Sequence, residues 1–144
     1  MKKFLLIIPS HCLTYKVVFN LFQNHGMLCG FNDVFWFYHK GEKTHVTSYW
    51  VNTLGKCKPP YKLTDKYSDN EYQKFDNYDA INIPNIKNIP YDYEGVMGVS
   101  VHFMVHYNPN QFEIVKFRKG NDNKDLRING KDLFAKVLIK KKVK

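Results

Sequence analysis

The sequence predicts an α/β fold in which a mixed β-sheet is accompanied by few helices. Two observations predict it: an apolar run and an amphipathic helical pattern open the chain, and most later segments are rich in β-forming residues. An independent doubly wound fold contains several alternating strand and helix units, whereas this sequence shows one. The 144 residues suit a single domain, which we expect to span residues 1–144.

The first strand and helix are predicted within the first 26 residues. Residues 4–8 form a continuous apolar run that Pro9 ends, which is typical of a parallel strand buried on both faces. Its five residues are fewer than the roughly seven to fifteen of an export signal, and no segment is long enough to span a membrane. From Thr14 onward apolar residues recur at helical spacing, and Gly26 is the predicted stop. The apolar positions of this helix are Val17, Val18, Leu21 and Phe22.

A β-hairpin is predicted next. Residues 34–38 and 44–54 are rich in β-formers, and a polar segment containing Gly41 separates them. Its loop is basic because of Lys40 and Lys43. Residues 55–74, with two adjacent prolines and many polar groups, are expected to run irregularly over the surface.

The remaining elements are predicted to be strands. Residues 90–98 are turn-rich, and we interpret Gly95 and Gly98 as permitting backbone conformations that side chains forbid. Asn129-Gly130 is typical of a tight turn. Strands are expected at residues 78–83, 99–107, 111–118 and 131–139.

Positive charge is concentrated at the end of the sequence. The net charge is +9, and residues 118–144 contain ten Lys and Arg against three Asp, so this end is expected to face phosphate. The abundance of Lys, Asn, Tyr, Phe and Ile fits either a nucleic-acid binder or the codon bias of an AT-rich genome. Cys12, Cys29 and Cys57 lack metal or disulfide spacing and predict reduced thiols in a cytoplasm.

Local motifs predict neither a metal site nor a catalytic site. His102 and His106 lie four residues apart, which is about 13 Å along the predicted strand and too far for one ion. The sequence contains no GxSxG, no GxGxxG and no P-loop motif.

Three blocks between residues 75 and 115 point to a family. The blocks are Phe75-Asp76-Asn77-Tyr78-Asp79-Ala80-Ile81-Asn82, then Ile89-Pro90-Tyr91-Asp92-Tyr93-Glu94-Gly95-Val96-Met97-Gly98-Val99, then Tyr107-Asn108-Pro109-Asn110-Gln111-Phe112-Glu113-Ile114-Val115. This succession resembles the EcoRI-type adenine-specific DNA methyltransferases, in which similar blocks occur in the same order. Looser similarity at residues 3–8, 50–54 and 128–131 extends the resemblance over nearly the whole chain.

The resemblance implies the latter half of a Rossmann-like class I methyltransferase fold. It also implies double-stranded DNA as partner, S-adenosyl-L-methionine as the family's cofactor, and flipping of the target adenine out of the duplex. The family's cofactor loop and Asn-Pro-Pro-Phe loop precede the segment similar to residues 4–8. We therefore expect no catalytic residue here, and no cofactor binding by this chain alone. Lys58-Pro59-Pro60-Tyr61 does not replace the catalytic loop, because lysine has no acceptor for the adenine amine.

Seven residues are predicted to contact DNA. The resemblance suggests a substrate-facing turn at Asp76, Asn77 and Tyr78, near Trp50 and Asn52, and the hairpin loop adds Lys40 and Lys43. The alternative is that Asp76 and Asn77 cap a turn while Tyr78 packs in the core.

The sequence departs from the family pattern at three places. Asn52 and Thr53 stand in reverse order, Ser100 replaces a common Pro, and His102 replaces a common Thr. Roles at these positions are therefore not carried over from the family.

Two functional hypotheses stay open, and a third is less favoured. The first is a split or truncated methyltransferase portion, inactive unless a separate chain supplies the amino-terminal half. The second is a DNA-binding module that does not modify DNA. The third is a decayed fragment, for which an exposed sheet edge would cause poor solubility.

Overall fold

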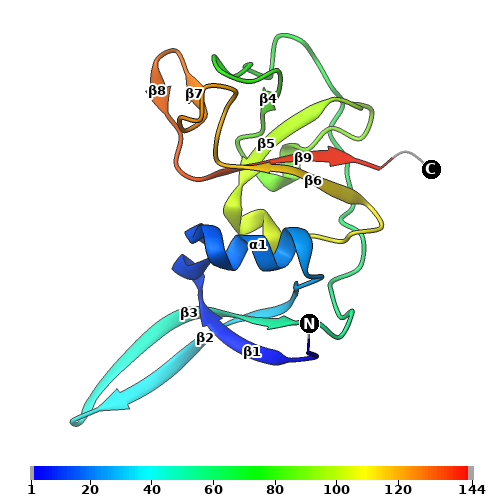
Figure 1. The fold of residues 1–144 in the computed structure, drawn as a ribbon. Helices are drawn as coiled ribbons and strands as arrows, with labels where there is room; N and C mark the ends of the chain where they lie inside the picture. The colour runs from blue at the N-terminus through cyan, green and yellow to red at the C-terminus, as the bar shows by residue number, and fades with distance from the viewer. Residues whose placement is uncertain (1, 143–144) are drawn as a thin grey trace. The chain divides into compact units, whose positions relative to one another are not determined.

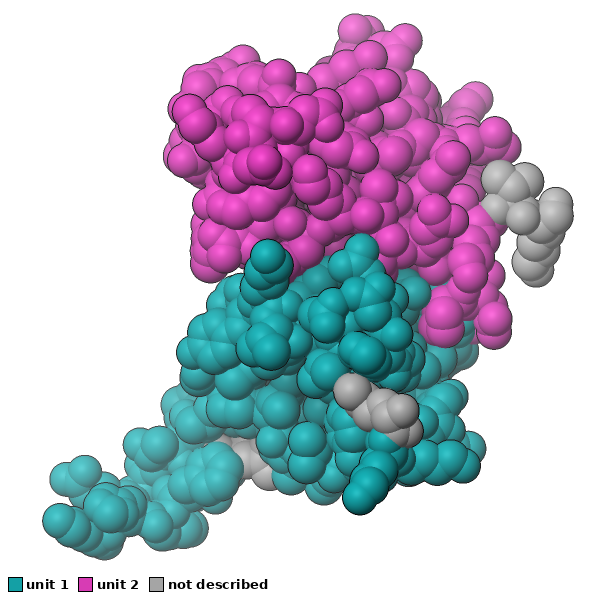
Figure 2. Space-filling model, viewed as in Figure 1, with its two compact units in different colours: residues 1–59, 104–108 teal, residues 60–103, 109–144 magenta. Residues whose placement is uncertain are grey.

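A computed structural model describes residues 2–142, with residues 31–35 described as backbone alone. The chain forms two compact units (Figure 2). Unit 1 comprises residues 1–59 and 104–108, and unit 2 comprises residues 60–103 and 109–144. The single-domain organisation stays a prediction.

Unit 1 contains a three-stranded antiparallel sheet in the order β1-β3-β2 (Figure 1). Its strands are β1 (Leu5–Pro9), β2 (Leu28–His39) and β3 (Glu42–Asn52). The predicted first strand is confirmed, but its parallel pairing and burial on both faces were wrong. β1 is an antiparallel edge strand, and Leu5 and Leu6 are 54% and 51% exposed. An apolar run favours a strand without specifying its neighbour or what covers its faces.

The predicted helix of unit 1 is confirmed. A 3-10 turn, η1 (Ser10–Thr14), precedes α1 (Lys16–Asn24). Phe19 and Phe22 are its buried positions, whereas Val17 is 73% exposed. Gly26 follows with a φ of +69°, a left-handed conformation that suits glycine after a helix.

The predicted hairpin is also confirmed, and its first strand is longer than expected. β2 and β3 are joined by the two-residue turn Lys40-Gly41, with φ of 49° and 80°. Positive φ at both central residues is the geometry of a type I′ turn, which matches strand twist. β1 pairs with β3 only at residues 48–52, so the distal hairpin is a two-stranded ribbon (Figure 1).

Unit 2 contains a mixed four-stranded sheet in the order β4-β5-β9-β6. β4 runs parallel to β5, and the other neighbours are antiparallel. These strands are β4 (Ile81–Asn82), β5 (Val96–Ser100), β6 (Phe112–Phe117) and β9 (Lys136–Lys141). The predicted mixed sheet with few helices is therefore confirmed, and α1 is the single α-helix within residues 2–142.

Smaller elements complete unit 2. The 3-10 turn η2 (Ile86–Asn88) lies between β4 and β5. The hairpin of β7 (Arg127–Ile128) and β8 (Lys131–Asp132) turns at Asn129-Gly130, where φ is 50° and 79°. The predicted tight turn is confirmed. The long strand expected at residues 131–139 is instead divided between β8 and β9.

The strand expected at residues 99–107 was wrong beyond Ser100. The chain turns there into the 3-10 segment η3 (Val101–Val105). Phe103, Met104 and Val105 are buried in succession, so burial does not follow the apolar and polar alternation that predicted a strand. The strand-based separation of His102 and His106 therefore does not apply. Within residues 2–142, however, no three His, Cys, Asp or Glu side chains gather to hold a metal.

A core cluster joins the 75–80 loop to the sheet of unit 2. It comprises Phe75, Ala80, Leu126 and Leu138, with Tyr78 packed against it. A Cβ on Gly98 would lie 2.4 Å from atoms of the Phe75 ring. Gly98 has no left-handed φ, and neither has Gly95, so our interpretation of these glycines was wrong. Close approach of an aromatic ring explains their small size.

Candidate nucleic-acid interface

The distal β2–β3 ribbon has two chemically different faces. In an antiparallel ribbon, paired residues share a face, and so do residues two apart along a strand. The register pairs Trp36 with His45 and Tyr38 with Lys43, which places these four side chains together. We call them the ribbon face. The opposite face contains the pairs Phe37–Thr44 and His39–Glu42.

Side-chain contacts organise the ribbon face. The Lys43 ammonium lies 4.2 Å from the centroid of the Trp36 ring and 5.9 Å from that of Tyr38. The His45 ring lies 5.0 Å from the Trp36 ring. Trp36 and Tyr38 are nevertheless 54% and 73% exposed. A cation held over exposed aromatic rings is suited to anionic, ring-containing partners.

The sequence pointed to part of this surface. Lys40 and Lys43, both predicted to contact DNA, are exposed at the tip of the ribbon. Trp36 and Tyr38 were missed as site residues. The signal that would have found them is their spacing of two residues in the predicted strand, which places both on one face, and the structure brings Lys43 onto that face.

Trp50 and Asn52 lie at the other end of β3, away from the turn. Asn52 is 2% exposed, and its side-chain oxygen accepts hydrogen bonds from the N–H groups of Leu54 (3.0 Å) and Lys56 (3.1 Å). Its amide also donates to the Lys56 carbonyl at 2.8 Å. Asn52 therefore fixes the turn after β3. Trp50 is half-buried beside an apolar depression that Leu5 also lines. Their contact with DNA stays a prediction.

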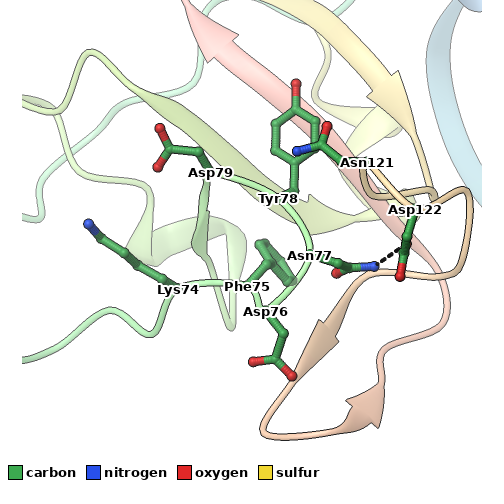
Figure 3. Close-up of a pocket in the computed structure, with 8 residues that line it drawn as sticks. All are labelled: Lys74, Phe75, Asp76, Asn77, Tyr78, Asp79, Asn121 and Asp122. Carbon is green, nitrogen blue, oxygen red and sulfur yellow. Dashed lines mark hydrogen bonds between the residues drawn. The ribbon is translucent and has the colours of Figure 1, made fainter.

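The 74–79 loop borders an open depression of about 450 Å³ (Figure 3). The Asp76 carboxylate accepts hydrogen bonds from the N–H groups of Asn129 (3.1 Å) and Gly130 (2.8 Å). Tyr78 is half-buried against the core cluster. These contacts are those expected from the alternative interpretation, a capped turn and a core tyrosine.

Asn77, like Asp76, connects this loop to a distant segment of the chain by side-chain hydrogen bonds. Its amide donates to the Asp122 carboxylate at 2.9 Å and to the Asp125 carbonyl at 3.0 Å, and its oxygen accepts the Arg127 N–H at 3.1 Å. Figure 3 shows the Asn77 side chain directed at Asp122. Contact of Asp76, Asn77 and Tyr78 with DNA stays a prediction.

The carboxylates of Asp122 and Asp125, two residues whose oxygens accept from Asn77, are stabilised in their charged form. The Asn77 hydrogen bond, with help from Lys124 N–H and Arg127, lowers the pKa of Asp122. The hydrogen bond from Lys119, supported by Arg118, lowers the pKa of Asp125. The ion pairs measure 2.7 Å for Lys119–Asp125 and 3.2 Å for Arg118–Asp125.

Intramolecular contacts engage much of the basic carboxy-terminal segment. Arg118, Lys119 and Arg127 are ion-paired. The Lys136 ammonium donates to the Ile83 carbonyl at 3.1 Å, and burial lowers its pKa. Lys141 donates to the Tyr91 carbonyl. The exposed lysines within residues 118–142 are Lys124, Lys131, Lys140 and Lys142. The surface charge offered to phosphate is therefore smaller than the count in the sequence suggests.

The segment with two prolines is held as a loop. The Lys58 carbonyl accepts a hydrogen bond of 3.1 Å from the Asn108 side chain. Nearby, burial raises the pKa of the Cys29 thiol to about 12, and the charge of Lys58 opposes this shift. Cys29 is therefore protonated near neutral pH and unsuited to be a nucleophile.

A family model matches the part of the chain that holds both the ribbon tip and the 74–79 loop. The model is that of the adenine-specific methyltransferase EcoRI, and it matches residues 34–142. The chain belongs to the EcoRI-type adenine-specific methyltransferase family. This confirms the family suggested by the three sequence blocks.

Individual relatives agree with this membership. The type II methyltransferase M.EcoRI of Escherichia coli is 40% identical, over 98% of this chain and 51% of its own length. The type II methyltransferase M.MgeORF184P of Mycoplasma genitalium is 39% identical over 64% of this chain and 35% of its own. M.MpnI of Mycoplasma pneumoniae is 43% identical over 46% of this chain. The chain thus spans about half the length of M.EcoRI.

No solved structure matches this chain. The helix and strands described above are those of an α/β fold. Similarity to the Rossmann-like sheet of class I methyltransferases stays a proposal. Within residues 2–142, no helix is both long and apolar enough to cross a membrane.

Proposed function

We propose that this chain is the DNA-facing portion of an S-adenosyl-L-methionine-dependent enzyme that methylates the N6 amine of adenine in duplex DNA. The observation that carries the proposal is the family match over residues 34–142, together with relatives that are type II methyltransferases. The proposal places the protein in the cytoplasm, where Cys12, Cys29 and Cys57 stay reduced.

We further propose that methyl transfer requires residues beyond these 144. When bound, S-adenosyl-L-methionine supplies an activated methyl group, and the adenine amine that receives it needs an acceptor side chain to hold it. The sequence contains no Asn-Pro-Pro-Phe, and Lys58 in its partial counterpart offers no acceptor. A polypeptide that carries the family's other half would supply the acceptor and the cofactor loop.

The edge strand β1 supports this need for a partner. Among the strands of residues 2–142, β1 has β3 as its one neighbour, and Leu5, Leu6 and Ile7 are 54%, 51% and 43% exposed. An exposed apolar edge strand is a template for pairing with a further strand. We propose that the other half of the methyltransferase covers β1 and continues the sheet in a Rossmann-like manner.

Tritiated methyl transfer to an AT-rich duplex tests the proposal. The chain is assayed alone and after co-expression with a polypeptide equivalent to the rest of M.EcoRI. No transfer is expected by either polypeptide alone, and transfer is expected from the pair. Robust turnover by this chain alone would contradict the need for a partner. Absence of transfer by a stable pair would contradict the enzymatic proposal.

The second candidate function is a DNA-binding module without catalysis. The exposed ribbon tip with Lys40 and Lys43 favours it. Such a module shifts labelled duplex in a salt-dependent way, since phosphate contacts release counterions, and stays inactive with the added half. Absence of binding at low salt would count against it. Circular dichroism that lacks a near-ultraviolet signal, together with non-cooperative unfolding, would indicate a decayed fragment instead.

A further inference from the structure

We infer that the ribbon face of β2–β3 enters the major groove of the substrate duplex and that its rings contact the base edges. The inference rests on the proposed function, because the partner it names is the DNA to be methylated. It adds the element that meets the DNA, the face that turns inward, and the side chains that bind.

The dimensions of the ribbon fit the groove. Beyond the residues paired with β1, the register continues with two strands from Thr47 to the turn at Lys40-Gly41. At about 3.3 Å per residue, residues 36–40 reach roughly 15 Å. The major groove of B-DNA is about 8.5 Å deep, so this reach is sufficient to arrive at the base edges, and its width of about 12 Å admits a two-stranded β-ribbon.

In the part of the chain that the structure describes, no third strand pairs with the distal ribbon, and its aromatic side chains stay largely exposed. Trp36, Phe37 and Tyr38 are each more than half exposed, at 54%, 51% and 73%. A two-stranded hairpin is at best marginally stable by itself in water. The two exposed rings that share the ribbon face, Trp36 and Tyr38, therefore offer the larger aromatic surface for contact.

Charge decides which face turns toward DNA. Lys43 and His45 lie on the ribbon face, whereas Glu42, the one acidic residue of the segment 36–47, pairs with His39 on the opposite face. A polyanion in contact with the ribbon face meets the ammonium and avoids the carboxylate. Lys40 at the turn adds a second cation near the phosphates.

The position of the Lys43 ammonium over the Trp36 ring suggests a separate role for the lysine and for the aromatic rings. The ammonium lies 4.2 Å above the Trp36 ring, so the lysine chain is ordered before binding. We assign Lys43 to a phosphate at the groove margin and the rings of Trp36 and Tyr38 to apolar contact with thymine methyl groups. The opposite face, with Phe37 and Thr44, is assigned no base contact.

A face-selective comparison tests the inference. Trp36→Ala and Lys43→Gln alter the ribbon face, and Phe37→Ala is the matched control on the opposite face with nearly equal exposure. Duplex binding is measured by mobility shift over a range of salt, with the chain alone and with the complementing half. We expect Trp36→Ala to weaken binding about fivefold or more. Lys43→Gln should lower the salt slope by about one, and Phe37→Ala should change affinity less than about twofold.

Two further measurements keep the outcome interpretable. Lys43→Arg should restore the salt slope, because it keeps the charge, and thermal unfolding shows whether each variant still folds. Guanine N7 lies in the major groove, so at a fixed protein concentration its protection from methylating reagents should weaken with Trp36→Ala and persist with Phe37→Ala.

The possible failures are distinct. If the unaltered chain neither binds duplex nor supports methylation in the pair, the proposed function fails. If the unaltered protein binds and methylates while Trp36→Ala and Phe37→Ala behave alike, the ribbon inference fails alone. Unchanged N7 protection in all variants would likewise overturn it, and would leave the ribbon to a protein partner.

Discussion

At the scale of single residues, side chains in the 74–79 loop of unit 2 connect distant parts of the chain. The Asp76 carboxylate binds the β7–β8 turn, and Asn77 reaches Asp122, Asp125 and Arg127. The sequence could predict that these residue types cap turns, because short polar side chains do so generally. It could not predict which turn they cap, since their partners lie 45 to 54 residues away.

Replacing Asn77 should expose this structural role. Asn77→Ala removes the acceptor of the Arg127 N–H and the donor to the Asp125 carbonyl, leaving both groups to water or unpaired. We expect a loss of about 1–3 kcal/mol in the free energy of unfolding. Urea denaturation measures it, and Asn121→Ala, on an exposed side chain of the same depression, is the control. Equal effects of the two substitutions would refute the role.

The ion pairs of Asp125 predict a dependence of stability on pH. Because its pKa is lower in the folded chain than the ordinary 3.8, the unfolded state binds more protons as the solution becomes acidic. This carboxyl therefore stabilises the fold fully well above pH 3.8, and the stabilisation is lost as pH falls through the folded pKa. Urea midpoints should fall more steeply from pH 5 to pH 3 for the unaltered chain than for Asp125→Asn. Parallel midpoints would contradict this assignment.

At the scale of elements, local signals predicted turns better than they predicted the extent of strands. Gly41 and Gly130 both mark two-residue turns in the structure, and Gly130 follows an asparagine, a residue type that tolerates a left-handed backbone. Residues 99–107 misled the prediction because their alternating pattern coincides with a segment buried in succession. Which side chains share the ribbon face depends on the pairing across the turn, which the position of Gly41 sets.

A substitution at the turn should test how far the ribbon depends on it. Gly41→Ala places a side chain at a φ of +80°, which destabilises by about 1 kcal/mol. Amide hydrogen exchange at residues 37–46 should accelerate, with exchange in unit 2 unchanged. Gly30→Ala on the same strand is the control, because its Cβ would meet only the Asn52 amide, at 3.9 Å. Slow exchange at the tip of Gly41→Ala would show that strand pairing alone holds the ribbon.

At the scale of the whole molecule, the family could be predicted from the sequence, but the order of the strands within each sheet could not. Three ordered blocks identified the family, and they fall within the matched residues 34–142. The position of β1 at a sheet edge follows from long-range pairing, with Leu5 opposite Asn52, which no local window contains. Its exposed apolar residues motivate the proposed docking of the family's other half, and this chain spans about half the length of M.EcoRI.

The edge of β1 yields the prediction that joins fold to function. Leu6→Lys puts a charge on an edge strand, and lysine there opposes the addition of another strand because its ammonium would be covered. Without the complementing half, the Leu6→Lys chain should self-associate less than the unaltered chain, as measured by sedimentation velocity. With the complementing half, methyl transfer should fall about tenfold or more, because a covered charge costs more than about 1.4 kcal/mol. Val17→Lys makes the same change at a 73% exposed position of α1, and it should alter neither quantity. If both variants reconstitute equally well, the other half does not dock on β1.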